Sequence, residues 1–497
     1  MRYISTRDKN RCADAPTVIK TGISPDGGLF VPESIPALGD GELYELISLD
    51  YRGRALKILQ KYLTGYDVDE LRLYVEKAYG TRFSSYPDIA PVVRLCDGLY
   101  SLELWHGPTC AFKDMALQLL PHLLTGALKK TGETRTAVIL TATSGDTGKA
   151  ALEGFRDVEG TKIVVYYPSE GVSSIQKLQM ISQQGNNVAV CGIEGNFDDA
   201  QNGVKAIFTD PAMIKALSDR GFFLSSANSI NWGRLAPQIV YYISAYCDLV
   251  KCGQLRLGDK VNFVVPTGNF GNILAGYYAA RMGLPVHKLI CASNRNNVLT
   301  DFIQSGRYDR NRPFYATASP SMDILVSSNL ERMLFDVLNR DDNALKGLMD
   351  ALKTEGRYRI GAGALRRLRG QFDAGFADED ATMAAISGVF TRYGYLCDTH
   401  TAVAFSVCDD YRQRTKDGTP AVVVSTASPY KFAKSVLSAL SEAPVEGKDD
   451  FEIMDELSRV SRTRPPQALY SLKKSAPRFT HVCGRRQLGS FLLNFLG

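Results

Sequence analysis

A repeated order of apolar strand, glycine-rich turn and helical run, starting near residue 93, most limits the folds open to this chain. In such an order each helix crosses back over the sheet, so successive strands run parallel and helices cover both faces. Strands buried in this way are continuous apolar runs. The order therefore predicts an α/β fold, with strands at 137–142, 162–167, 187–191, 261–266, 288–293 and 421–426.

A lysine occupies one of these strand-to-helix turns. The stretch HGPTCAFKD, residues 106–114, follows an alternating strand at 99–105 and precedes a helical run that starts at Asp114. Asp114 is predicted to cap that helix, which places Lys113 beside the positive end of the helix and among apolar neighbours. Both effects disfavour the ammonium form, and a neutral amine is what Schiff-base chemistry requires. The alternative is an ordinary solvated lysine at a helix start.

A second turn joins the strand 261–266 to a helix that is predicted to begin at Ile273. Its sequence is TGNFGN, residues 267–272. A glycine-rich turn of this kind aims backbone N–H groups and the helix dipole at one point, which is a ready anion site. We expect a phosphate there, although glycines can serve turn geometry alone. The glycine spacing matches neither the dinucleotide fingerprint nor a P-loop.

Two further turns lie after strands. TATSGDTG, residues 141–148, offers hydroxyls and amides that could hold a carboxylate, or Asp146 could simply cap the helix that follows near Thr147. STASP, residues 425–429, precedes a predicted helix over 430–440. Ligands of open α/β sheets bind beyond the carboxyl ends of the strands. All four turns are therefore expected at one ligand site.

A polar run, SSANSINWGR at 225–234, precedes another helical stretch. Arg234 is a candidate for binding a phosphate carried by a substrate, because a guanidinium matches phosphate oxygens bidentately. The alternative is an arginine at a helix start that pairs with a nearby acid.

Composition excludes several classes of protein. The net charge is only +5 over 497 residues, with basic and acidic residues interleaved, so no nucleic-acid partner is predicted. The first residues, MRYISTRDKNRC, lack an apolar segment, and no apolar run approaches the ~18 residues of a membrane span. We therefore expect a cytoplasmic protein without a membrane partner. The ten cysteines are scattered without zinc-site spacing, so no metal site is predicted.

The flanking parts are less regular. Residues 1–92 hold short mixed elements, with helical patterns at 41–63 and 68–79. After about residue 440 the apolar strand pattern stops, and the stretch 443–480 is predicted to pack as a peripheral tail with a helix or two.

The sequence resembles threonine synthase, a family in the fold-type II class of pyridoxal-phosphate enzymes related to the tryptophan synthase β subunit. HGPTxAFKD is highly specific within this class, whereas TSGDTG and GNFGN are shared more loosely. The matching stretches follow the family's order over most of residues 1–440: DGGLFVP at 26–32, HGPTCAFKD at 106–114, TATSGDTG at 141–148, SANSIN at 226–231, VPTGNFGN at 265–272 and SPSMDI at 319–324.

The resemblance implies two open, parallel-type sheets covered by helices, with the active site in the cleft between two domains and an α+β segment before them. The implied large domain comprises 93–133 and 241–440, and the small domain comprises 134–240. Residues 1–92 form the N-terminal segment and 441–497 form the tail.

The resemblance also implies roles for residues. Lys113 would form the internal aldimine with pyridoxal 5'-phosphate, and Thr426 would face the pyridine nitrogen. The cofactor phosphate would be held by Gly268, Asn269, Phe270, Gly271 and Asn272. The substrate would be bound by Thr143, Ser144, Asp146 and Thr147 at its α-carboxylate, and by Asn228, Asn231 and Arg234 at its phosphate.

The family converts O-phospho-L-homoserine and water into L-threonine and phosphate, with the freed Lys113 as general base at Cα. The protein is expected to be a monomer or a homodimer. The nearest alternative activity is a phospho-lyase or dehydratase that releases a 2-oxo acid, and a more distant one is a non-catalytic phospho-ligand-binding protein. Two departures touch the pocket: Ser428 stands where the family usually has histidine, and Cys110 where it usually has leucine.

Overall fold

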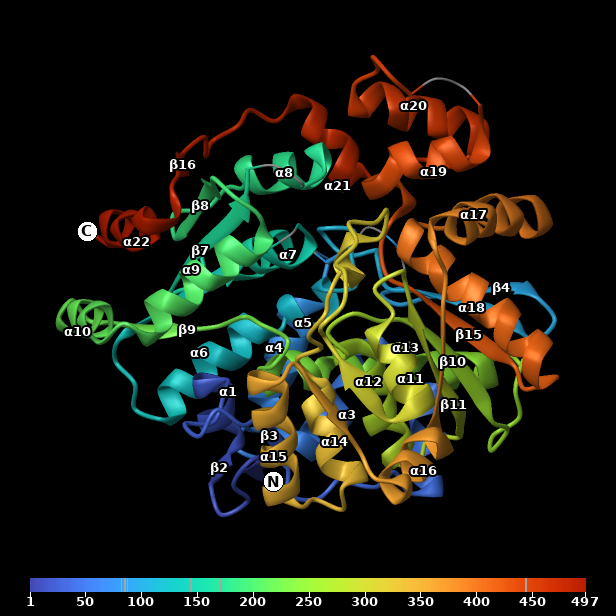
Figure 1. The fold of residues 1–497 in the computed structure, drawn as a ribbon, viewed down its shortest axis with the longest axis horizontal. Coiled ribbons are helices and arrows are strands. Elements are labelled where there is room, and N and C mark those ends of the chain that lie inside the picture. Colours follow the sequence, from blue (N-terminus) through green and yellow to red (C-terminus); the bar gives the residue numbers. More distant parts are fainter. Residues whose placement is uncertain (82, 85, 87, 144, 170–171, 443–444) are drawn as a thin grey trace.

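The computed structural model describes residues 1–497 except 82, 85, 87, 144, 170–171 and 443–444. Two helix-covered sheets dominate it, and Figure 1 shows the smaller at the upper left and the larger at the lower right. The larger sheet is parallel except for its edge strand β4, which runs antiparallel to β5. Its strands are, in order, β14 (Phe372–Phe376), β11 (Val286–Ser293), β10 (Val261–Pro266), β15 (Ala421–Ser425), β5 (Leu99–Glu103) and β4 (Val92–Cys96).

The smaller sheet is parallel throughout. Its strands are, in order, β16 (Val482–Cys483), β8 (Val188–Ile193), β7 (Thr161–Pro168), β6 (Thr136–Ala142) and β9 (Phe222–Ser225). The helices of this region are α7 (Asp146–Phe155), α8 (Ser174–Ile181), α9 (Phe197–Thr209) and α10 (Pro211–Asp219). Every residue of β8 and β10 is buried, as expected for strands covered on both faces. The predicted fold class is confirmed, whereas the four domain boundaries remain a prediction.

The N-terminal segment combines a small antiparallel sheet with helices. The sheet consists of β1 (Arg2–Ser5), β2 (Cys12–Asp14) and β3 (Phe30–Pro32), and the helices are α1 (Ala15–Thr21), α2 (Asp40–Ser48), α3 (Tyr51–Tyr62) and α4 (Val68–Ala78). The helical pattern predicted at 41–63 forms two helices, α2 and α3. The chain leaves the helical path between α2 and α3 because Asp50 caps α3, its side chain accepting from the Gly53 N–H.

The remaining helices pack on the larger sheet and around it. They are α5 (Asp114–Leu117), α6 (Leu120–Lys130), α11 (Trp232–Lys251), α12 (Gly271–Arg281), α13 (Val298–Ser305), α14 (Leu330–Val337), α15 (Asp342–Thr354), α16 (Ala362–Gln371), α17 (Glu379–Tyr393), α18 (Thr399–Thr415) and α19 (Ala433–Leu440). Two 3-10 turns, η1 (Pro320–Met322) and η2 (Pro429–Phe432), and the hairpin β12 (Arg307–Asp309) with β13 (Arg357–Arg359) complete this part.

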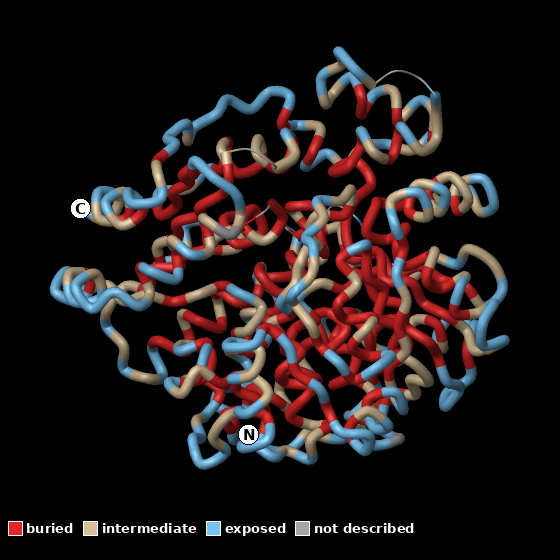
Figure 2. Tube along the Cα trace, viewed as in Figure 1, coloured by how far each residue is buried: buried red, intermediate tan, exposed pale blue. Residues whose placement is uncertain are grey.

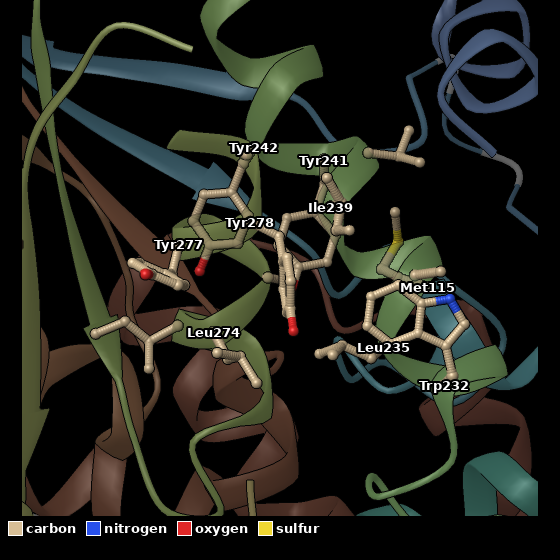
Figure 3. Close-up of a cluster of buried hydrophobic side chains, with 14 of the residues drawn as sticks. Met115, Trp232, Leu235, Ile239, Tyr241, Tyr242, Leu274, Tyr277 and Tyr278 are labelled. Atoms are coloured by element: carbon tan, nitrogen blue, oxygen red, sulfur yellow. The ribbon is translucent and has the colours of Figure 1, made fainter. Parts of the chain in front are cut away.

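Helix α11 forms the centre of the core. It is buried along almost its whole length, because most of its side chains are apolar and it packs against α2, α3, α5 and α12. Trp232 lies with its ring centroid 5.3 Å from those of Tyr3 and Tyr278. Figure 3 shows Tyr241 and Tyr242 projecting from this helix toward α12. Figure 2 shows the buried residues concentrated around the larger sheet.

A buried arginine joins the N-terminal segment to the rest of the chain. Arg332 donates to the Phe30 carbonyl at 2.9 Å, to Asn329 Oδ1 at 2.6 Å and to the Ile230 carbonyl. Burial lowers its pKa to about 10. The DGGLFVP stretch, the 225–234 run and the segment after η1 are thereby fixed to one another.

The tail packs on α19 at its start and on the smaller sheet at its end. Its first helix, α20 (Asp450–Ser461), contacts α19 and buries Leu457 in the same hydrophobic cluster. Further on, β16 pairs with β8, and α22 (Leu488–Leu496) buries Leu488 and Leu492 against the smaller sheet. Short elements between them are α21 (Gln467–Tyr470), η3 (Ser471–Lys474) and η4 (Arg485–Gln487). The tail was predicted to form a helix or two. In the structure it forms more elements than that, including the strand β16.

Within the described part of the chain, no helix is long and apolar enough to cross a membrane. The same residues contain no group of three or more His, Cys, Asp or Glu side chains that could hold a metal ion.

Candidate active site

The lysine turn is held by the carboxylate of Asp114. Helix α5 begins at Asp114 itself and Lys113 takes the cap position, so the prediction of Asp114 as N-cap was wrong. The carboxylate instead accepts from the Thr109 N–H and hydroxyl, each at 2.8 Å, and folds the turn back on itself. Burial raises the pKa of Asp114 to about 6.

The same turn is joined to the loop after β15. The Phe112 N–H donates to the Thr426 carbonyl at 2.8 Å, and the Ser428 N–H donates to the Cys110 carbonyl at 3.1 Å. The two departures from the family pattern, Cys110 and Ser428, are therefore direct neighbours. Burial raises the pKa of the Cys110 thiol to about 12, which fits a packing role.

The Lys113 amine lies in a buried and electrically mixed environment. Its Nζ is 3.4 Å from Ser321 Oγ and 3.6 Å from the Asp146 carboxylate. Burial lowers its pKa, the charge of Asp146 opposes that shift, and the cations Arg234 and Lys431 reinforce it. A lysine in this position has an increased neutral fraction, as an amine nucleophile requires.

Asp146 is not the cap of its helix, and its contact with a substrate remains a prediction. Helix α7 begins at this residue with Gly145 as its cap, and the carboxylate accepts from Lys431 Nζ at 2.6 Å and Gln176 Nε2 at 2.7 Å. Burial would raise its pKa, but Lys431 and Lys113 hold it well below the usual range. In the structure this carboxylate pairs with Lys431 and lies 3.6 Å from Lys113 Nζ.

The rest of the 141–148 turn is partly used by its own geometry. Thr143 Oγ1 accepts from the Gly145 and Gly148 N–H groups at 3.0 and 2.9 Å. Gly145 has φ 144°, a conformation that side chains disfavour, and an added Cβ there would meet Gln176 at 2.5 Å. Thr147 is half-buried, and Ser144 lies outside the described residues. Their contacts with a substrate remain predictions.

The glycine turn presents its amides because its carbonyls are already bound. Ser327 Oγ donates to the Gly268 carbonyl at 2.8 Å, and the Asn329 N–H donates to the Asn269 carbonyl at 3.1 Å. Phe270 adopts the left-handed conformation, φ 62°, as the cap of α12, which begins at Gly271 rather than at the expected Ile273. The first amides of a helix have no acceptor within it, so those of α12 remain available to an anion.

The side-chain amide of Asn272 shows whether this turn fits a phosphate. Its Oδ1 accepts from the Tyr241 and Tyr242 hydroxyls at 2.6 and 2.7 Å, which fixes the orientation of the amide. Its Nδ2 is buried and has no partner in the described part of the chain. A fixed, unsatisfied donor at the start of α12 matches a phosphate oxygen, so the residues present fit the cofactor phosphate.

Arg234 is buried without an acidic partner among the described residues. Its Nη1 donates to the Ala227 carbonyl at 2.9 Å, and its Nε has no hydrogen-bond partner in the described part of the structure. Burial lowers the pKa of Arg234 to about 10, and its positive charge lowers the pKa of Lys113. The alternative of an arginine paired to a nearby acid was therefore wrong.

The two asparagines of the same run lie differently. Asn231 caps α11, with Oδ1 accepting from the Gly233 N–H and Nδ2 donating to the Ile19 carbonyl, each at 2.9 Å. Asn228 is exposed. The role of either as a substrate ligand remains a prediction.

Three residues at the site were missed from the sequence: Ser321, His400 and Lys431. Ser321 lies in SPSMDI, a stretch that was used only for the resemblance. His400 is one of just five histidines and follows Asp398 by two residues at the start of α18. That scarcity was a usable signal. Lys431 had none, because its partner Asp146 is far away in sequence.

Family models match most of the chain. The model described as pyridoxal-phosphate dependent enzyme matches residues 94–427. Those described as threonine synthase N terminus and threonine synthase, C-terminal match residues 2–79 and 401–483.

Individual relatives agree with these models. Threonine synthase from Pseudomonas aeruginosa is 40% identical, over 89% of this chain and 92% of its own. Human threonine synthase-like 1 is 43% identical over 84% of this chain, which spans only 57% of that protein. The crystal structure of PLP-bound threonine synthase from Brucella melitensis superposes with a TM-score of 0.88 at 37% identity, covering 100% of this chain and 99% of that one. The yeast threonine synthase structure also gives 0.88, at 31% identity, covering 99% of this chain and 98% of that one.

Proposed function

We propose that this chain, which belongs to the threonine synthase family of pyridoxal-phosphate-dependent enzymes, converts O-phospho-L-homoserine and water into L-threonine and phosphate. Pyridoxal phosphate is the cofactor of the family, and the residues at the site fit it. The observation that carries the substrate proposal is Arg234, a buried cation that acts on Lys113 and has no acidic partner among the described residues.

The residues divide the work of holding the cofactor. Lys113 would attach it covalently, and the amides of 268–272 with Asn272 Nδ2 would hold its phosphate. Ser321 Oγ is 3.4 Å from Lys113 Nζ, and its carbonyl oxygen lies 2.8 Å from where a Cβ on Gly268 would stand. One residue therefore spans the two attachment points. Bound there, the cofactor supplies an electron sink for the substrate α-carbon.

Lys113 is the proposed general base at Cα. A proton acceptor needs a neutral amine near the working pH, and burial moves the pKa of Lys113 in that direction. The nearby Asp146 carboxylate stabilises the ammonium once the proton has been taken. The pair thus permits both halves of a proton transfer.

The test is to identify the product. Purified protein with cofactor and O-phospho-L-homoserine should release threonine and inorganic phosphate in equal amounts. Predominant 2-oxobutyrate and ammonia would replace this proposal with the phospho-lyase alternative. Cofactor-loaded protein that binds the substrate without turnover would support the non-catalytic alternative.

Asn272→Asp should weaken cofactor binding. The change keeps an acceptor for Tyr241 and Tyr242 but replaces the free donor with an anion facing a phosphate. Losing one charged hydrogen bond costs about 1.5–3 kcal/mol, so the Kd for pyridoxal phosphate should rise roughly ten- to a hundredfold. Titration of the apoprotein measures this, with the exposed Asn186→Asp as the matched control. An unchanged Kd would place the phosphate elsewhere.

Thr426→Asp should alter the electronic state of the cofactor. A neutral hydroxyl cannot hold a proton on the pyridine nitrogen, whereas a carboxylate can. We expect a shifted absorption spectrum and reduced turnover, recorded on the loaded protein beside Thr419→Asp, at a partly exposed residue outside the site. If the spectrum and the rate both match wild type, Thr426 does not face the ring nitrogen.

A further inference from the structure

Asp398 and His400 form a hydrogen-bonded pair that contacts Ser321, the neighbour of Lys113. His400 Nδ1 is 2.8 Å from Asp398 Oδ2, and His400 Nε2 is 3.2 Å from the Ser321 N–H. Both side chains are buried, with 3% and 0% exposed. The imidazole also packs against Phe432, with the two ring centroids 4.9 Å apart.

The hydrogen bonds select one form of the imidazole. The Ser321 N–H can only donate, so Nε2 must accept and carries no proton. The ring proton therefore lies on Nδ1 and is donated to Asp398. Asp398 is fixed in turn, because its other oxygen accepts from the Thr401 N–H and hydroxyl at the start of α18.

The residue that this histidine contacts touches both sides of the proposed cofactor site. Ser321 Oγ accepts from Lys113 at 3.4 Å, and its carbonyl lies against Gly268, where even a Cβ would approach to 2.8 Å. A shift of η1 would therefore displace the lysine contact and the wall of the glycine turn together. On the large-sheet side, His400 bonds directly to the backbone of that residue.

We propose that Asp398 and His400 form a positioning pair, which fixes Ser321 between Lys113 and the glycine turn and so fixes the orientation of the cofactor. The inference deepens the proposed function and rests on it for the site but not for the identity of the substrate. Neither side chain takes part in a proton transfer to substrate.

Two amide substitutions separate the hydrogen bond from mere packing. The glutamine oxygen in His400→Gln reaches about as far as Nε2 and can still accept from the Ser321 N–H. The shorter side chain in His400→Asn reaches only as far as Nδ1 and leaves that N–H unpaired. In Asp398→Asn the new amide can donate to Nδ1, which selects the tautomer whose Nε2–H opposes the Ser321 N–H, while asparagine still caps α18.

The readouts are the visible circular dichroism of the attached cofactor, which reports its orientation, and kcat with KM. In His400→Asn and Asp398→Asn we expect the dichroism per attached cofactor to fall by about half or more and kcat to fall about tenfold, with KM within about threefold of wild type. In His400→Gln the dichroism per attached cofactor should match that of wild type, and kcat should stay within about threefold of wild type. Thermal unfolding of each apoprotein verifies the fold.

The outcomes are distinct. Equal losses in His400→Gln and His400→Asn would overturn the proposal, because packing against Phe432 would then be the role of the ring. Wild-type dichroism and kcat in His400→Asn or Asp398→Asn would also overturn it. If His400→Asn fails to fold, the contrast of Asp398→Asn with His400→Gln decides in the same way. If wild type makes no threonine but the dichroism separates the variants as expected, positioning stands and the substrate assignment fails.

Discussion

Lys113→Ala is expected to fold normally and to lose threonine formation by about a thousandfold or more, since attachment of the cofactor and proton transfer at Cα both depend on this amine. The fold should survive because Asp146 keeps its 2.6 Å pair with Lys431. Lys113→Arg should be equally inactive, because it keeps the charge but cannot attach the cofactor.

The measurement is product formation together with borohydride reduction and mapping of the labelled residue. Wild type should carry the label on Lys113. Neither variant should carry a label at any residue. Lys129→Ala, at an exposed residue of α6, is the matched control and should behave as wild type. Near wild-type threonine formation by Lys113→Ala would refute the assignment.

Arg234→Ala should lower kcat/KM for O-phospho-L-homoserine by roughly ten- to a hundredfold, the equivalent of about 1.5–3 kcal/mol for one charged hydrogen-bond partner. Among the residues that the structure describes, the Arg234 side chain donates to the Ala227 carbonyl and makes no ion pair, so its removal breaks none there. Amino acids without phosphate, such as serine, should be much less affected.

The control for this variant is Arg72→Ala, which removes an exposed arginine whose ion pair with Asp69 contributes little. Both variants are assayed on phosphohomoserine and on serine. If serine turnover falls as far as phosphohomoserine turnover, Arg234 is structural and the substrate phosphate binds elsewhere.

The central strands of both sheets were predictable from the sequence because most of them are continuous apolar runs that end in turns. The six predicted runs lie within one or two residues of β6, β7, β8, β10, β11 and β15. The helix starts were less predictable. Asp114 and Asp146 follow turns, as capping residues do, yet each begins its helix. The Asp114 carboxylate binds Thr109 within its own turn, and the Asp146 carboxylate binds the distant Lys431. Local pattern cannot distinguish these two uses of one side chain.

The partners of the lysine were beyond local pattern altogether. Asp146 follows β6 of the smaller sheet and Lys431 follows β15 of the larger sheet, so their 2.6 Å contact exists only once both regions have folded and met. Ser321 and His400 lie in segments without a periodic signal, and the Ser321 N–H that joins them is a backbone group that sequence does not display. The turns of the site were therefore predictable from the sequence, whereas the long-range contacts that connect them were not.

The tail has a consequence for biosynthesis. The edge strand β16 and the helix that buries Leu492 come from residues 482–496, whereas the other strands of the smaller sheet come from 136–225. A ribosome therefore releases the central strands of this sheet more than 250 residues before it releases the cover of their edge. Until then the outer edge of β8 is unpaired, a state prone to association with other chains. The smaller sheet is thus completed only after β16 and α22 have been synthesised. Until then, these elements do not yet shield the β8 edge from other chains.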